Sequence, residues 1–198
     1  MILRLPADLN PKELLAWQLK KIQSMFEEIV PGNAFYTKRL RAAGVKTIES
    51  LEEFSQLVPF TFKKDWVEDQ QKHPPYGTNL TYELHSYTRL HQTSATKGRP
   101  LYWLDTPESW TWALDNWNHV YQTAGLTSED RILFPFSFGP FYGFWTAFES
   151  ASRLGCLCLP SGGLRSSARL RMIVDHGCTV VCCTPTYVRR LAEAAREE

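Results

Sequence analysis

The 198-residue sequence predicts an α/β fold, with a helical N-terminal section over residues 1–80 and alternating strand–helix units over residues 81–198. Two observations support this fold class. In the first section, apolar residues recur at helical spacing between typical capping residues. In the second section, short apolar runs alternate with helices that end at glycines. This alternation indicates a mainly parallel sheet covered by helices.

Four helices are expected in the N-terminal section, over residues 11–29, 34–43, 50–57 and 63–71. Asn10 is a suitable N-cap for the first helix, with Pro11 in its first turn. Gly44 ends the second helix, because glycine readily adopts the left-handed conformation of a helix terminus. Ser50 and Glu53 have the spacing of a capping box at the start of the third helix. The segment 74–77, Pro-Pro-Tyr-Gly, ends this section.

The second section begins with a strand, a polar turn and another strand, in which residues 87–91 lead into the turn and residues 101–104 leave it. Helices are then expected over residues 109–124, 141–154, 166–176 and 186–196. Strands are expected over residues 131–136, 156–159 and 179–183. Gly125, Gly155 and Gly177 end the first three of these helices.

Charge and hydropathy exclude several classes of partner. The chain carries 22 basic and 21 acidic residues, a formal net charge of +1, and has no long basic run, so nucleic acid is not an expected partner. No apolar stretch approaches the roughly 18 residues of a membrane span. The N-terminus also lacks the basic and apolar regions of a secretion signal. These features favour a cytoplasmic protein with no membrane association.

The five cysteines lie in the last quarter of the chain, inside apolar runs. Their odd number and their strand-like surroundings favour reduced thiols that pack as small hydrophobic side chains. A metal site is not expected, because there is no Cys-x-x-Cys pair and the five histidines lack metal-like spacing. No Gly-x-Ser-x-Gly motif is present, so no catalytic nucleophile is assigned.

The turn between the first two strands, residues 92–100, has the composition of a phosphate-binding loop. It offers backbone N–H groups, hydroxyls and two cations to one anion. The candidate ligand-binding residues are Thr93, Ser94, Thr96, Lys97, Gly98 and Arg99. It is not a Walker loop, because no Gly-Lys-Ser/Thr triplet opens a helix. The alternative is an ordinary polar hairpin connection.

Three further loops follow the expected parallel strands, at the edge where α/β sheets place ligands. Residues 136–143 (Phe-Ser-Phe-Gly-Pro-Phe-Tyr-Gly) form either an aromatic-lined pocket for a flat or apolar substrate or plain core packing. Residues 160–163 either bring backbone close to a ligand or form a simple turn. Residues 184–187 are explained by helix initiation, with Thr184 as N-cap and Pro185 in the first turn.

Taken in order, these segments resemble the phenylacetate–CoA ligase branch of the adenylate-forming (acyl-CoA synthetase) enzymes. The resemblance runs from about residue 35 to the end. It rests on Phe35-Tyr36 with Gly44, residues 57–61 with Lys63, residues 93–100, Gly125 with Asp130, Phe138-Gly139, residues 160–163 and residues 184–187. It implies that the loop 93–100 encloses the phosphates of ATP. It also implies that ATP, Mg²⁺ and CoA are used to activate a small carboxylic acid, with Phe138, Phe141 and Tyr142 near an aromatic acid.

The chain departs from the family pattern within the loop and in length. Ala95 replaces a glycine and Lys97 replaces a hydroxyl residue, while Arg99 conserves the charge of a lysine. The chain is also less than half as long as the family's members. The resemblance implies that it lacks their adenine-binding and magnesium-binding segments and their small C-terminal domain.

We therefore expect a truncated part of the large N-terminal domain of an ATP-dependent acid–CoA ligase, inactive as residues 1–198 alone. The acid is expected to be aryl or apolar. One alternative is a non-catalytic ligase-like binding or partner module, and another is acyl transfer to a protein thiol. Truncation of the sheet would expose an apolar edge, so self-association is also expected.

Overall fold

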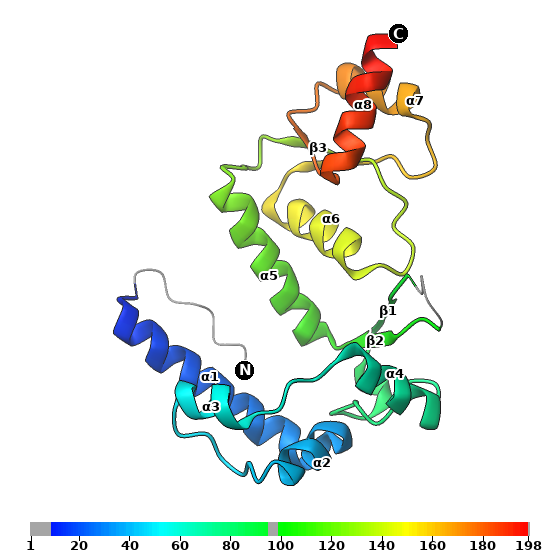
Figure 1. Ribbon diagram of the computed structural model, residues 1–198. Coiled ribbons are helices and arrows are strands. Elements are labelled where there is room, and N and C mark those ends of the chain that lie inside the picture. The colour runs from blue at the N-terminus through cyan, green and yellow to red at the C-terminus, as the bar shows by residue number, and fades with distance from the viewer. Residues whose placement is uncertain (1–8, 95–98, 198) are drawn as a thin grey trace. The chain divides into compact units, whose positions relative to one another are not determined.

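The computed structural model describes residues 9–94 and 99–197, and the chain divides into two compact units, Met1–Thr106 and Pro107–Glu198 (Figure 1). The change of architecture expected at residues 80 and 81 therefore falls inside the first unit. The reason is that the hairpin that follows residue 81 is bonded to the helices that precede it. The side chain of Gln70 accepts a hydrogen bond from Tyr102 N at 3.0 Å and donates one to Tyr102 O at 2.7 Å.

The first unit contains the four expected helices, α1 (Pro11–Gly32), α2 (Ala34–Ala42), α3 (Leu51–Leu57) and α4 (Lys63–Lys72). The Asn10 side chain accepts from Lys12 N and Glu13 N, and Glu13 accepts in return from Asn10 N, which completes a capping box. Ser50 caps α3 by accepting from Glu53 N at 3.0 Å. These caps confirm the helix starts that were predicted from the sequence.

The core of the first unit is formed where α1 packs against α2 and α3. Phe26, Leu40, Val45 and Ile48 are each at most 6% exposed. The ring of Phe26 meets that of Phe54 edge to face, with centroids 6.4 Å apart. After α4 come a short 3-10 helix, η1 (Leu84–Ser86), and an antiparallel hairpin of β1 (Arg89–Gln92) and β2 (Tyr102–Asp105).

The second unit is the α/β part of the chain. It comprises α5 (Pro107–Thr123), β3 (Arg131–Phe134), α6 (Tyr142–Leu154), β4 (Leu157–Pro160), α7 (Ser166–Asp175), β5 (Val180–Val181) and α8 (Pro185–Glu197). The three strands form a parallel sheet in the order β4-β3-β5. The connection from β3 through α6 to β4 and the connection from β4 through α7 to β5 cross the sheet in opposite directions. Because parallel crossovers are right-handed, these two connections place α6 and α7 on opposite faces. The α/β class is thereby confirmed.

Two strands are shorter than expected, each for a physical reason. β3 stops at Phe134 because Pro135 has no N–H to continue the ladder. β5 has only two residues, although Thr179 N and Cys182 N still donate to Arg131 O and Leu133 O at 2.9 and 3.0 Å. The pairing therefore covers most of the expected segment, and the chain then turns into α8.

The core of the second unit surrounds the central strand. Ile132, Leu133 and Phe134 have no exposed surface, as expected for a strand buried on both faces. Helix α6 packs on the sheet through residues such as Ala147 and Ala151, which are 2% and 0% exposed. These small side chains let the helix backbone approach the strands closely.

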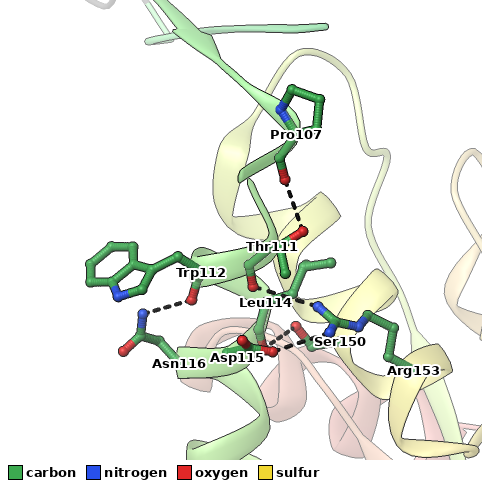
Figure 2. A network of polar contacts seen from close by, with 8 residues as sticks. All are labelled: Pro107, Thr111, Trp112, Leu114, Asp115, Asn116, Ser150 and Arg153. Atoms are coloured by element: carbon green, nitrogen blue, oxygen red, sulfur yellow. Dashed lines mark hydrogen bonds and ion pairs between the residues drawn. The ribbon is translucent and has the colours of Figure 1, made fainter. Parts of the chain in front are cut away.

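Polar contacts hold α6 to α5 (Figure 2). The buried hydroxyl of Ser150 donates to Leu114 O at 3.0 Å. Near the surface, Arg153 forms an ion pair with Asp115 at 3.1 Å, and its guanidinium also lies 3.5 Å from Thr111 O. This pair of helices therefore forms a fixed support on one side of the sheet.

Candidate functional site

An apolar cavity of about 440 Å³ lies in the second unit, where β3 and β5 end. It is lined by Trp117, Pro135, Phe136, Gly143, Phe144, Ala147, Cys182, Cys183, Thr184 and Tyr187. The lining comes from α5, from the loops that follow β3 and β5, from the first two turns of α6 and from the first turn of α8. This is the carboxyl edge of a parallel sheet, where the sequence predicted ligand-binding loops.

Stacked aromatic rings form one wall of the cavity. Phe136 and Phe144 are nearly parallel, with centroids 4.3 Å apart and an interplanar angle of 20°. Phe136 also meets the buried ring of Phe134 edge to face at 5.8 Å. Beside them, a Cβ atom placed on Gly143 would meet nothing within 4 Å. The packed rings thus form the closed part of the wall, and the space beside Gly143 is unfilled.

Of the predicted acid-contacting residues, Phe138 and Phe141 pack against rings of this wall, whereas the ring of Tyr142 packs against Trp110. Phe138 packs on Trp145 and Phe148, with ring centroids 4.8 and 5.2 Å away. Phe141 is the residue before α6, and Tyr142 is its first residue. The residues of this aromatic segment that line the cavity are instead Phe136 and Phe144. The roles that the resemblance implies for Phe138, Phe141 and Tyr142 therefore stay a prediction, and the sequence did not single out Phe136.

Two thiols, Cys182 and Cys183, line the cavity, and the phenol of Tyr121 belongs to the same hydrophobic core as Cys182. Tyr121 is 5% exposed and donates to Ala147 O at 2.8 Å, and burial raises its pKa above the ordinary value. Burial likewise raises the pKa of Cys182 and Cys183, which line the cavity, and raises the pKa of Cys158 to about 11. All five cysteines are free, as expected, but only Cys156 is fully buried. At neutral pH these thiols are protonated and act as apolar groups.

A buried polar cluster lies next to the cavity and was not found from the sequence. Arg169 of α7 is 8% exposed. Its Nε donates to Ser161 O at 3.0 Å, and its Nη1 donates to the hydroxyl of Tyr187. The hydroxyls of Ser166 and Tyr187 lie 3.5 Å apart. Residues 184–187 do start a helix as predicted, because Thr184 Oγ1 accepts from Tyr187 N at 3.3 Å, but Tyr187 also contacts this arginine.

The loop of residues 160–163 packs against protein rather than opening to a cavity. Ser161 is 1% exposed, and both its N–H and its hydroxyl donate to Phe134 O at 3.1 Å. A Cβ on Gly162 would lie 3.1 Å from Phe136 O and 3.2 Å from the Cα of Ser137. Glycine is thus required here so that this loop can pack against the loop after β3.

The expected phosphate loop is described only at its ends. Thr93 closes the hairpin, since its N–H donates to Leu101 O and its hydroxyl accepts from Leu101 N, both at 3.0 Å. Ser94 and Arg99 are exposed. Thr96, Lys97 and Gly98, with Ala95, lie outside the described residues. The phosphate-binding role of the loop therefore stays a prediction.

An aspartate at the opposite edge of the sheet holds two loops together. Asp130 accepts from Thr127 N at 2.8 Å and from the hydroxyl of Thr179 at 2.7 Å. The hydrogen bond from the Thr127 backbone, followed by that from Thr179, lowers the pKa of Asp130 below its ordinary 3.8. This residue therefore belongs to the framework of the sheet.

Neither a metal centre nor a membrane helix is found in the part of the chain that the structure describes. Within residues 9–94 and 99–197, no three His, Cys, Asp or Glu side chains gather so that they could hold a metal ion. The use of Mg²⁺ that the resemblance implies stays a prediction. No helix in these ranges is long and apolar enough to cross a membrane.

Known proteins similar to this chain include acid–CoA ligases. A phenylacetate–coenzyme A ligase from Thermus thermophilus is 28% identical over 182 residues, which cover 91% of this chain and 39% of the ligase. A 2-hydroxyisobutyryl-CoA ligase solved with 2-HIB-AMP and CoA superposes over 96% of this chain with 26% identity and a TM-score of 0.90. The resemblance to the phenylacetate–CoA ligase branch is confirmed.

The similarity covers most of this chain but less than half of each ligase. An open conformation of the same 2-hydroxyisobutyryl-CoA ligase matches with a TM-score of 0.89 and 25% identity, over 96% of this chain and 44% of the solved chain. No protein-family profile matches the sequence. The two units and their loops thus have the architecture found in part of an adenylate-forming ligase, with a sequence far from that of the relatives.

Proposed function

We propose that this chain forms part of an enzyme that activates a carboxylic acid with ATP as an acyl-adenylate and passes the acyl group to CoA. The observation that carries the proposal is an apolar cavity at the carboxyl edge of the parallel sheet, in a chain whose similarity to acid–CoA ligases covers nearly all of its length. A solved relative is described with an acyl-AMP intermediate and CoA, the two ligands that this reaction requires.

Each unit carries residues for a different part of the proposed reaction. In the second unit, the aromatic and aliphatic lining removes water from the body of the acid, which favours an aryl or apolar acid. In the first unit, the hydroxyls and cations of residues 93–99 bind the phosphates of ATP. Adenylation develops negative charge on the transferred phosphoryl group, and positioned cations stabilise that charge.

Pyrophosphate release tests the proposal. Residues 1–198 and the product of the complete reading frame that contains them are each assayed for acid-dependent release of pyrophosphate and for formation of acyl-CoA. We expect activity from the complete product and none from residues 1–198 alone. Two folded but inactive proteins would overturn the ligase and favour a non-catalytic binding module. Pyrophosphate release without acyl-CoA would point to another thiol acceptor.

Variants of the loop test the assignment of ATP. Arg99→Ala and Lys97→Ala each remove one cation from the predicted phosphate site, and ATP affinity should fall about tenfold in each. Arg41→Ala is the matched control, because Arg41 is an exposed arginine of the same unit. Equal ATP affinities in all three variants would show that the loop does not bind the nucleotide.

A further inference from the structure

We propose that Arg169 and Tyr187 form an oxyanion site at the polar end of the cavity, where they hold the carboxylate of an acid whose apolar body occupies the cavity. The identity of the ligand as an acid rests on the proposed function. The anion site itself rests on the geometry and charge of α7 and α8.

Arg169 is a buried cation whose contacts do not neutralise its charge. It is 8% exposed, and its partners are the carbonyl of Ser161 and the phenol of Tyr187, both uncharged. Within the described ranges, no carboxylate forms an ion pair with it. Buried charges in proteins are normally paired, because an unpaired one loses its hydration without compensation. The missing counter-charge is therefore expected from a ligand.

The segments that carry Arg169 and Tyr187 are rich in basic residues. Residues 165–169 and the first part of α8 contribute four arginines: Arg165, Arg169, Arg189 and Arg190. From residue 161 to residue 190 the only acidic residue is Asp175, the last residue of α7. The N-termini of these two helices add partial positive charge. An anion is thus favoured beside Arg169 both by its neighbours and by the backbone.

Tyr187 connects this charge to the cavity. Tyr187 is one of the residues that line the cavity, and the guanidinium of Arg169 lies 5.1 Å from the centre of its ring. The phenol oxygen accepts from Arg169, which leaves the phenol proton to be donated to a ligand. Burial alone would raise the pKa of Tyr187, but hydrogen bonds with Ser166 and Arg169 and the charges of Arg169 and Arg190 lower it overall. A more acidic phenol is a stronger donor to a carboxylate.

The shape and lining of the cavity favour a carboxylate on an apolar body. The volume of about 440 Å³ lies within the usual range of small-molecule sites, roughly 300 to 1,000 Å³. A small inorganic anion would leave the aromatic wall of Phe136 and Phe144 uncovered. An aryl or alkyl acid buries that wall and places one charged group at Tyr187.

Calorimetric titration of the 198-residue protein tests this site without ATP or turnover. Three ligands share one phenyl body: phenylacetate, phenyl phosphate and the neutral 2-phenylethanol. Tyr187→Phe keeps the ring and removes the donor, and Arg169→Met keeps the length of the side chain and removes the charge. Arg171→Met is the matched control, an exposed arginine of the same helix. Circular dichroism establishes whether each variant is folded. If Arg169→Met is unfolded, Tyr187→Phe alone tests the proposal.

We expect Tyr187→Phe and Arg169→Met to weaken phenylacetate binding about tenfold or more, because a hydrogen bond to a charged group is lost. Binding of 2-phenylethanol should change less than about twofold, and Arg171→Met should leave phenylacetate unaffected. Equal losses for the acid and the alcohol, an equal loss in Arg171→Met, or no binding of phenylacetate would overturn the proposal. Tighter binding of phenyl phosphate than of phenylacetate would assign the site to a phosphate instead. Since pyrophosphate release is measured separately, failure of this site and failure of the ligase function are distinguishable.

Discussion

Gly143 offers a substitution that should stabilise the protein. It is the second residue of α6, it lines the cavity, and a Cβ placed on it meets nothing within 4 Å. Alanine therefore fits without displacement of any neighbour. Because alanine loses less backbone entropy on folding than glycine, Gly143→Ala should raise the free energy of unfolding by about 0.4 to 1 kcal/mol.

Gly155, at the other end of the same helix, is the matched control with the opposite expected sign. Its φ is +95°, and a Cβ there would lie 3.0 Å from the Cβ of Ser128. An L-residue in the left-handed region costs about 1 to 2 kcal/mol, so Gly155→Ala should lower the free energy of unfolding. The two variants should differ in that free energy by about 1.5 to 3 kcal/mol.

Urea unfolding followed by far-ultraviolet circular dichroism measures both variants, with the slope of the transition checked for constancy. Loss of stability in Gly143→Ala, or none in Gly155→Ala, would refute the reasoning from backbone conformation and open space. A further variant, Gly143→Leu, extends the side chain into the cavity. It should weaken phenylacetate and 2-phenylethanol alike, whereas loss of the Tyr187 hydroxyl should weaken only the acid.

Three further outcomes are expected. Phe134→Ala, at a position with no exposed surface, should lower the free energy of unfolding by about 3 to 5 kcal/mol, whereas Val174→Ala, at a side chain 79% exposed, should change it by less than about 0.5 kcal/mol in the same urea assay. Because the pKa of Asp130 is lowered in the folded state, its carboxylate stabilises the fold above pH 3.8, and this stabilisation is lost as the pH falls through the folded-state pKa. The melting temperatures of the wild type and Asp130→Asn should therefore converge on acidification, and a constant difference would contradict this. Strands β4 and β5 are the two edges of the described sheet, and Leu157 on β4 is 55% exposed, so sedimentation should detect self-association that Leu157→Lys reduces; a monomer at all concentrations would contradict it.

The sequence predicted the elements whose signals are local. The side chains of Asn10 and Ser50 can accept hydrogen bonds from the first N–H groups of a helix, and Gly155 has no side chain that would hinder the left-handed conformation of a helix end. Helix ends could therefore be located from a few neighbouring residues. The strand after Gly177 was also predicted, although its regular pairing covers only Val180 and Val181. Its ends depend on a partner strand that is distant in sequence, which local patterns do not specify.

The candidate site could be predicted only in position. The rule that ligands bind at the carboxyl edge of parallel strands placed it correctly at the loops after β3 and β5. It did not distinguish Phe136, which lines the cavity, from Phe138, two residues later, because both are aromatic and both pack on the same helix. Arg169 escaped notice because an arginine on a helix is usually exposed. Its burial follows from contacts with Ser161 and Tyr187, which lie 8 and 18 residues away.

The two hydrogen bonds between Gln70 and Tyr102 change what amide exchange reports in the first unit. The Tyr102 N–H donates to a side chain of α4 rather than to the neighbouring strand. Its exchange with solvent deuterium should therefore follow the release of α4, whereas the Thr93 N–H, bonded to Leu101 O, should follow the opening of the hairpin. Two amides near the base of one loop would then record two separate opening motions. Their protection factors would show whether helix and hairpin open as one cooperative unit.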